Sequence, residues 1–227
     1  DTPQVHIDPS EKAEIRRVLV DFIKNRSAWY TKRMDIQRPQ PKQPRPADAK
    51  EVFKGAIFTV YQWPQKVFDG SEAVWEVARR ADTAVVIPVT AEGKIIVLDQ
   101  EQPGRPAFMS FPGGRAEEGE EIEASARREL LEETGYTAKE LTLIKAYQPT
   151  TKLDWAIYIF IARGCVRRQA QALDAGEKIA VREITFDDFL TLAADGKLSA
   201  PEVTEMVLRA LLDPAKKAEL KTLFTPR

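Results

Sequence analysis

Two side chains that carry much of protein chemistry are nearly absent from this sequence. Among 227 residues there is one cysteine, Cys165, and one histidine, His6. A single cysteine excludes an intramolecular disulfide, which fits a reducing compartment such as the cytoplasm. One histidine near the start argues against a Ser–His or Cys–His nucleophile and against a multi-histidine zinc site. Any metal would therefore be held by oxygen atoms, which favours magnesium or manganese.

Long apolar runs and an excess of one charge are also absent. No stretch of about 18 apolar residues occurs, so no transmembrane helix is predicted, and the amino terminus lacks a signal-peptide pattern. The formal net charge of −1 provides no overall attraction to nucleic acid or to a membrane surface. With 43% apolar and 30% charged residues, we expect a globular cytoplasmic protein that binds neither membrane nor nucleic acid.

The N-terminal part predicts a helix followed by a proline-rich connector. The sequence DPSE at residues 8–11 is typical of a helix start, and apolar residues recur at helical spacing as far as Trp29. RPQPKQPRP favours an extended chain that lies against another surface, such as a second subunit. We therefore assign residues 1–36 to a helical segment and residues 37–50 to the connector.

The rest of the chain alternates between strand and helix patterns. Two strand-like runs flank the turn signal Asp69-Gly70, which predicts a small antiparallel subdomain over residues 51–80. Residues 81–227 hold the main domain, and strands with helices before and after them predict a layered α/β arrangement. Its expected strands are residues 83–90, 94–100, 108–114, 141–147 and 155–162.

Two helices are expected near the C-terminus. The first spans residues 186–194, and the second begins at the capping box SAPE, residues 199–202, with Ser199 as the cap. The apolar stripe of the second helix predicts these buried residues: Val203, Met206, Val207, Ala210 and Leu211.

One stretch, GRAEEGEEIEASARRELLEETGY from Gly114 to Tyr136, concentrates carboxylates on a predicted helix. Ile122, Ala126 and Leu130 are four residues apart and form an apolar stripe that must face the sheet. The glycine at position 135 suits a left-handed helix end. The helix is therefore amphipathic, and its polar side carries the acidic residues.

Clustered carboxylates repel each other unless a positive group lies among them. Glu129 and Glu133 share one face of the helix, and Glu132 lies beside them. Arg128 can orient one or two of these groups by bidentate pairing, and a divalent cation would be a stronger solution, since magnesium takes carboxylate oxygens. The preceding Gly113-Gly114 allows the backbone to approach a metal or a phosphate closely. The alternative, a solvated acidic face, remains our interpretation for Glu117, Glu118, Glu121 and Glu123.

The stretch resembles the Nudix box, G-x5-E-x7-R-E-U-x-E-E-x-G-U, where U is a bulky aliphatic residue. Tyr136 departs from the final aliphatic position, and we expect this to affect packing rather than chemistry. Seven fixed letters would coincide by chance at roughly one in 10^8 starting points. The resemblance implies an α/β/α sandwich with a mixed sheet, over about residues 83–212. The matching residues are Gly114, Glu120, Arg128, Glu129, Leu130, Glu132, Glu133 and Gly135.

The Nudix resemblance implies hydrolysis of a nucleoside diphosphate linked to another moiety, with bound magnesium ions and an attacking water. Glu129 and Glu133 are then implied as direct metal ligands, and Glu132 as a ligand or as the holder of a metal-bound water. The carbonyl of Gly113 is a further implied ligand. Arg128 is implied to orient the carboxylates. Glu120 is implied to support the helix start or to reach an outer metal.

Features outside the box are similar to ADP-ribose pyrophosphatases. Pro149 lies in a loop where those enzymes carry a proline, although such prolines also occur for structural reasons. The acidic loop of residues 173–189 places Glu177 where the family often supplies a general base or another metal ligand. The alternative for Glu177 is a solvated loop residue. Arg105, in EQPGR, lies where these enzymes place an arginine near the phosphates.

The N-terminal part resembles the subdomain through which nucleoside-diphosphate-sugar hydrolases dimerise, with the partner helping to bind the base. A homodimer is therefore expected. Trp63, with Trp75 and Tyr61, is a candidate for stacking on adenine, and core or interface packing is the alternative for each. Glu76 and Arg79 are candidate ligand contacts.

The expected substrate is ADP-ribose or a related nucleoside diphosphate sugar, cleaved to a nucleoside monophosphate and a sugar phosphate with Mg²⁺, or Mn²⁺, as cofactor. One alternative is a nucleoside triphosphate, cleaved to the monophosphate and pyrophosphate. Compact triphosphate hydrolases often lack such an N-terminal extension. A second alternative is a ligand-sensing domain without turnover, against which the intact carboxylate set argues. Charge alone does not exclude capped RNA as a substrate.

Overall fold

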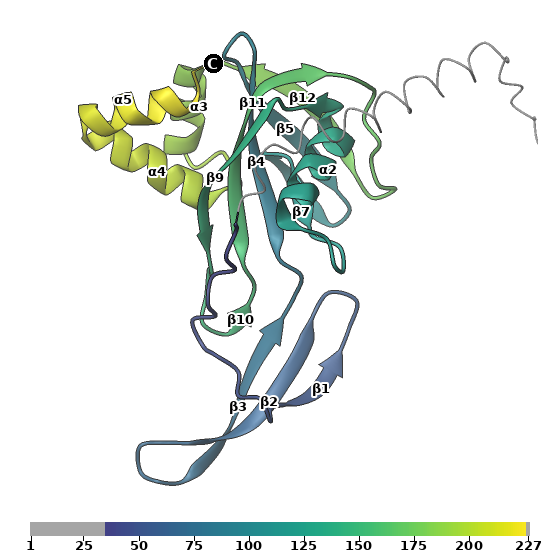
Figure 1. The fold of residues 1–227 in the computed structure, drawn as a ribbon, viewed down its shortest axis with the longest axis vertical. Helices are drawn as coiled ribbons and strands as arrows, with labels where there is room; N and C mark the ends of the chain where they lie inside the picture. Colours follow the sequence, from purple (N-terminus) through teal and green to yellow (C-terminus); the bar gives the residue numbers. More distant parts are fainter. Residues whose placement is uncertain (1–34, 226–227) are drawn as a thin grey trace, which may run out of the picture. The chain divides into compact units, whose positions relative to one another are not determined.

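A computed structural model describes residues 35–225 of the chain (Figure 1). The helix predicted to end near Trp29 lies outside the described residues, as does nearly all of the segment 1–36. Two compact units divide the chain, Asp1–Gln37 and Arg38–Arg227. The fold of the second unit positions the candidate site.

The main sheet of the second unit has eight strands and is mixed. Its central pair, β4 and β11, is parallel, and the other pairings are antiparallel. The path β12-β5-β4-β11-β8 is extended by β6 on β5, β7 on β4 and β9 on β11. The strands are β4 Thr83–Thr90, β5 Ile95–Gln102, β6 Arg105–Ser110, β7 Gly113–Arg115, β8 Tyr136–Thr137, β9 Glu140–Tyr147, β11 Ile157–Arg167 and β12 Lys178–Ile184.

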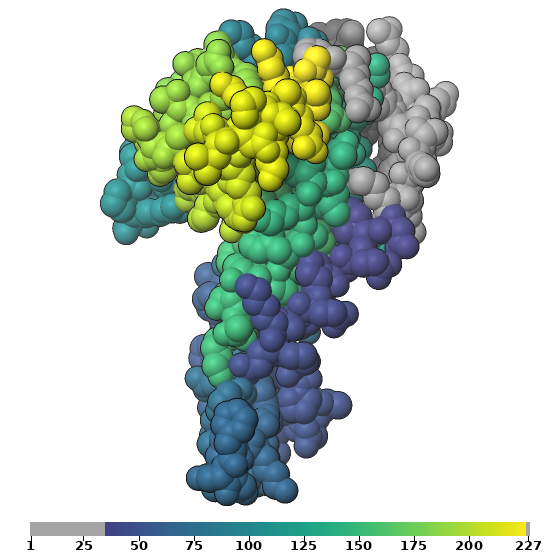
Figure 2. All heavy atoms as spheres, turned by 90° about the vertical axis from the view of Figure 1, so that its left-hand side faces the viewer, coloured from purple at the N-terminus to yellow at the C-terminus, as the bar shows by residue number. Residues whose placement is uncertain are grey.

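Helices cover both faces of this sheet, which explains why β4 and β11 are apolar on both sides. Alternate residues, such as Ile87 and Ile159, face a core formed with the C-terminal helices, in which Phe189 and Val207 are fully buried. The helix α2 packs on the opposite side (Figure 1). Figure 2 shows α4 and α5 as an outer layer. The helices are α2 Ile122–Thr134, α3 Phe186–Ala194, α4 Pro201–Leu212 and α5 Pro214–Leu223.

The expected α/β sandwich with a mixed sheet is therefore confirmed. No helix in the described part of the chain is both long and apolar enough to cross a membrane.

A second, four-stranded sheet has the order β1-β2-β3-β10. The β2–β3 hairpin turns at the predicted Asp69-Gly70, where the glycine has a φ of 88°. We expected an antiparallel sheet, but β10, from the main domain, pairs with β3 in parallel, so the sheet is mixed. Its strands are β1 Lys50–Lys54, β2 Thr59–Lys66, β3 Glu72–Arg79 and β10 Leu153–Asp154.

The proline-rich connector is extended and lies against its own chain. Arg38 bonds to Asp82 and to Asp154, each at 2.7 Å. Farther along, the guanidinium of Arg45 lies 3.7 Å from the ring centre of Tyr61. These contacts join the connector to the residue before β4, to β10 and to β2.

Two details of the C-terminal helix were predicted wrongly. The N-cap of α4 is Ala200, which has no capping side chain, and not Ser199. Ser199 lies outside the helix, and its N–H donates to the Met109 carbonyl of β6 at 2.7 Å. Leu211 is 45% exposed rather than buried. It lies about 100° around the helix from Ala210, beyond the buried side.

The packing of α2 on the sheet predicts a large loss of stability for Leu130→Ala. The Leu130 side chain is 1% exposed, so truncation leaves a cavity and should lower the free energy of unfolding by about 2–5 kcal/mol. Urea denaturation would measure the change. The control is Leu208→Ala on α4, whose side chain is 45% exposed and should cost less than about 1 kcal/mol. Equal losses in the two variants would contradict this packing.

Candidate active site

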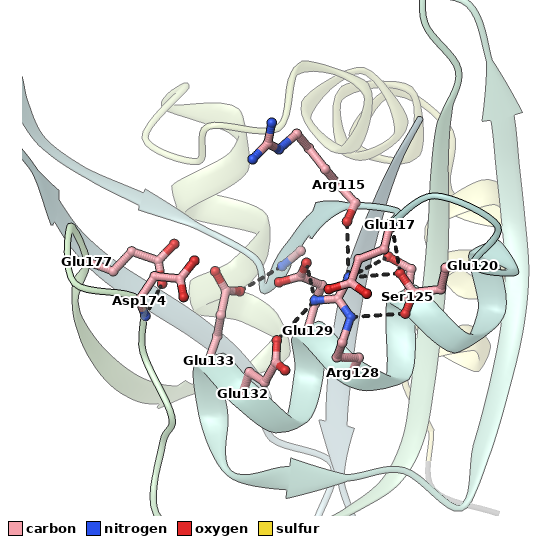
Figure 3. A network of polar contacts seen from close by, with 11 residues as sticks. Arg115, Glu117, Glu120, Ser125, Arg128, Glu129, Glu132, Glu133, Asp174 and Glu177 are labelled. Atoms are coloured by element: carbon pink, nitrogen blue, oxygen red, sulfur yellow. Dashed lines mark hydrogen bonds and ion pairs between the residues drawn. The ribbon is translucent and has the colours of Figure 1, made fainter. Parts of the chain in front are cut away.

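The acidic residues of α2 lie on a different side of the helix from its apolar residues, because the apolar side packs on the strands. Ala126 and Leu130 are buried against the strands. The helix ends at Gly135, which is left-handed with a φ of 75° and donates its N–H to the Leu131 carbonyl. Glu129, Glu132 and the mostly buried Glu133 are thereby directed towards β7 and the neighbouring loop (Figure 3).

The two glycines of β7 let the backbone come against these carboxylates. The N–H of Gly113 donates to Oε2 of Glu133 at 2.8 Å. A Cβ atom on Gly114 would collide with the carboxylate of Glu129, and one on Gly113 would collide with the Ala84 carbonyl of β4. Neither position therefore has room for a side chain, which explains the glycine pair in physical terms.

Arg128 joins three carboxylates and the loop before the helix (Figure 3). Its Nη1 donates to Glu129 at 2.8 Å and to Glu132 at 3.0 Å. Its Nε and Nη2 donate to the two oxygens of Glu120, each at 3.0 Å, and Nη2 also reaches the Arg115 carbonyl. Arg128 lowers the pKa of Glu120. Of the two roles expected for Glu120, support of the helix start fits these contacts.

Glu133 is the most strongly perturbed of the carboxylates. Its side chain is buried, and burial is the main cause that raises its pKa to about 8. The negative charges of Glu129, Glu177 and Glu132 add to this increase, while the Gly113 N–H opposes it. Burial likewise raises the pKa of Glu129. The cluster is therefore electrostatically unfavourable without a cation.

The carboxylate groups of this cluster are suitable ligands for a hard divalent cation. Between residues 35 and 225, no three acidic, histidine or cysteine side chains already converge as a metal-binding group. Arg128 instead holds Glu129 and Glu132, and Glu133 faces the Gly113 N–H. All the side-chain donors are carboxylate oxygens, which is the chemistry that magnesium and manganese accept. Glu129, Glu132 and Glu133 are the residues that would hold the ion.

A cavity of about 240 Å³ opens beside the carboxylates. Glu177, on the loop before β12, and Arg105, at the start of β6, belong to its wall together with Gly113 and Glu133. The guanidinium of Arg105 lies 3.4 Å from the Phe108 ring centre and donates to Ser199 Oγ at 3.2 Å. The remaining lining residues are Thr83, Val85, Gln100, Gln102, Phe108, Ser110, Phe111, Ser199 and Ala200. A larger cavity, about 290 Å³ between α4, α5 and β9, contains no member of the carboxylate cluster.

Four of the predicted binding residues do not line the cavity. Trp63 is 6% exposed in the small sheet, and its indole N–H donates to Gln65. Glu76 accepts a hydrogen bond from Gln62. Arg79 lies at the end of β3, and Pro149 lies in the loop before β10.

Two arginines near the cavity were not predicted from the sequence. Arg80 stacks on Trp155 at 4.5 Å, and the Trp155 indole donates to Thr83, which lines the cavity. Arg115 lies opposite Thr83 in the sheet. Neither guanidinium has an ion-pair partner within residues 35–225, and burial and Arg115 lower the pKa of Arg80. The adjacent Arg79-Arg80 pair was the available signal, and the prediction selected the first.

Comparisons with known proteins match this architecture. The NUDIX domain model matches residues 78–206. The chain is 35% identical over 146 residues to the ADP-ribose pyrophosphatase of Bacillus subtilis (strain 168), covering 63% of this chain and 79% of that protein. It is 27% identical over 144 residues to the methanol dehydrogenase activator of Bacillus methanolicus, covering 62% and 78%. A crystal structure of an ADP compounds hydrolase has the same fold, with a TM-score of 0.60 at 19% identity over 81% of this chain and 98% of that one.

The buried charge of Glu133 predicts a pH-dependent gain of stability in Glu133→Gln. Because its pKa is raised from an unfolded value of about 4.3, the folded wild type loses stability as the pH rises towards about 8. Glutamine removes the charge and keeps an oxygen for the Gly113 N–H. In metal-free buffer at pH 9, the melting temperature should therefore rise by roughly 2–4 °C, equivalent to about 1 kcal/mol. At pH 4 the two proteins should melt together.

The matched control is Glu118→Gln, since Glu118 is exposed in the loop before α2. This change should leave the melting temperature nearly unchanged at either pH. If Glu133→Gln melted no higher than the wild type at pH 9, the carboxylate of Glu133 would not be unfavourably buried.

Proposed function

This chain belongs to the Nudix family, and from that premise we propose that it hydrolyses the pyrophosphate bond of ADP-ribose or a related nucleoside diphosphate sugar. The products are a nucleoside monophosphate and a sugar phosphate, and the cofactor is Mg²⁺, with Mn²⁺ as a substitute. The observation that carries the proposal is the carboxylate pair of the partly buried Glu129 and the buried Glu133 against the backbone of Gly114 and Gly113. Of these residues, Glu133 and Gly113 belong to the wall of the cavity.

The residues around the cavity suit a doubly charged diphosphate. Glu129, Glu132 and Glu133 would hold the metal, with the Gly113 carbonyl as a further ligand. Bound metal would neutralise charge that develops on the phosphate oxygens and would acidify the attacking water. Arg128 keeps two of these carboxylates in place through its hydrogen bonds. The carboxylates thus act as a unit rather than as independent groups.

Arginines complement this negative cluster. Arg105 lines the cavity, and Arg80 and Arg115 lie beside Thr83 without carboxylate partners among residues 35–225. Guanidinium groups pair with phosphate oxygens through charge-assisted hydrogen bonds. These three side chains are therefore the proposed anchors for the parts of the diphosphate that the metal leaves free.

Glu177 is the proposed general base. It lies at the cavity with Glu133 and belongs to the loop before β12. In hydrolysis the water oxygen bonds to one phosphorus, the bridging P–O bond breaks, and the water proton passes to the base. A carboxylate on a loop can approach the substrate after binding, which would exclude solvent from the reacting atoms.

Two observations favour a sugar diphosphate over a triphosphate. The relative from Bacillus subtilis, 35% identical, is named an ADP-ribose pyrophosphatase. The chain also carries the connector and most of the small sheet before residue 78, where the NUDIX match begins. We propose a cytoplasmic enzyme, since its one cysteine, Cys165, is a buried free thiol.

The decisive experiment is phosphate release from a panel of substrates with Mg²⁺ and a coupled phosphatase. ADP-ribose should be cleaved to AMP and ribose phosphate. Glu129→Gln and Glu133→Gln should each lower kcat by roughly 100-fold or more, because each removes a metal ligand. Glu118→Gln, in the same acidic stretch, should retain wild-type turnover. Chelation by EDTA should abolish activity, and restored Mg²⁺ should recover it.

The panel also contains nucleotide sugars, dinucleoside polyphosphates and triphosphates. Turnover of triphosphates alone would retain the metal site and disprove the substrate. No turnover by the wild type on any member would disprove the proposed activity and favour a ligand-sensing domain.

We further propose that residues 51–80 form a homodimer interface and that residues 81–227 form the catalytic domain. The edge strand β1 is exposed along its whole length, which leaves its backbone donors and acceptors open for another chain. Large apolar side chains are exposed on the same subdomain, including Phe53 at 57% and Val74 at 72%. Such a patch is typical of an interaction surface. In a dimer, Trp63, Glu76 and Arg79 would belong to the partner-facing part.

The dimer predicts a mass in light scattering of roughly twice 25.6 kDa. Val74→Asp places a charge on the proposed interface and should shift the protein towards the monomer, because an unpaired charge is costly to bury. Leu211→Asp, on the exposed side of α4, is the matched control and should leave the mass unchanged. A monomeric wild type would contradict the interface.

A further inference from the structure

The segment after β11 passes directly over the end of the helix α2. The N–H groups of Arg168 and Gln169 donate to the Gly135 carbonyl at 2.8 and 3.3 Å. The N–H of Ala172 donates to the Glu132 carbonyl at 2.8 Å. The last carbonyls of a helix have no partners within the helix, so this segment supplies them. The contact is close enough that a Cβ atom on Gly135 would collide with the Gln169 carbonyl.

One side chain of this segment joins the helix to the next strand. Nε2 of Gln171 donates to the Glu133 carbonyl of α2 at 2.6 Å and to the Ile179 carbonyl of β12 at 3.3 Å. A glutamine amide has two N–H groups, so a single nitrogen serves both acceptors. Residues 172–177 therefore form a loop before β12 whose two ends are joined through the Gln171 amide.

This loop carries Glu177. Within it, the Glu177 N–H donates to the Asp174 carbonyl at 3.0 Å, and the Asp174 N–H points to the Glu177 carboxylate at 3.4 Å. Ile179, the anchor on β12, follows Glu177 by two residues. Figure 3 shows Glu177 and Asp174 across from Glu133. Any movement of Ile179 relative to α2 would change the separation between Glu177 and the carboxylate cluster.

We propose that Gln171 is a positioning residue, which holds the Glu177 loop in register with the carboxylates of α2. The inference rests on the proposed function for its effect on turnover. Gln171 does not line the cavity, so it would act through Glu177 rather than on the substrate. Its two acceptors are both carbonyl oxygens, which a glutamate of the same size would repel and a leucine would leave without a donor.

Hydrogen exchange tests, without any substrate, whether the hydrogen bonds of Gln171 hold the loop. Gln171→Leu should accelerate amide exchange in the loop of residues 172–177 by about 10-fold, because it removes the hydrogen bonds that close the loop. The control is Gln169→Leu, since Gln169 is exposed and makes no side-chain hydrogen bond within residues 35–225. Unchanged exchange in Gln171→Leu would overturn the proposal. If this variant unfolds, Gln171→Glu, which keeps the size of the side chain, replaces it.

Steady-state kinetics then test the action through Glu177. Gln171→Leu should lower kcat about 10-fold with little change in KM, while Gln169→Leu should match the wild type. In a Glu177→Gln background, Gln171→Leu should cause no further loss, because the group that it positions is already disabled. Losses that multiply in the double variant would overturn the positioning role. If the wild type cleaves no member of the panel, the proposed function fails, and hydrogen exchange alone still decides whether Gln171 holds the loop.

Discussion

The site depends on one electrostatic constraint, the burial of the Glu133 carboxylate against the Gly113 N–H and beside Glu129. Burial and like charge both oppose ionisation of this group, so the folded chain stores an unfavourable arrangement that a divalent cation would relieve. Proteins retain such arrangements where function requires them. The glycines at 113 and 114 follow from the same constraint, because side chains there would occupy the space of the Glu129 carboxylate or of the β4 backbone.

The surrounding fold keeps this arrangement in place from three directions. The apolar side of α2, with Leu130 at its centre, fixes the height of the carboxylates above the sheet. Arg128 joins Glu132 of the helix to Glu120 in the loop before it. The segment that contains Gln171 holds the end of the helix. Each attachment comes from a different part of the chain, so the position of α2 depends on all three.

The helix α2 was predictable in detail because the sequence signals that define it are local. The spacing of Glu129 and Glu133 predicted one shared face, and the helix does end at Gly135. The cap at Ser199 was predicted wrongly, because a backbone bond to Met109, far away in sequence, holds that residue outside the helix. The parallel strand β10 was missed for the same reason, since two residues in a loop carry no periodic pattern and their partner strand is remote.

The sequence by itself determined the family, the mixed α/β class and the restriction of candidate metal ligands to oxygen atoms. A motif of fixed spacing and a hydrophobic period are both encoded in neighbouring residues. Only the tertiary structure decided that Arg105 and Glu177 share a cavity with Glu133, and that Trp63 and Arg79 do not. These relations depend on which strand edges and loops meet in space. Strand pairing and helix packing between segments that are far apart in the sequence decide which residues come together. The local sequence around a single side chain does not encode such contacts.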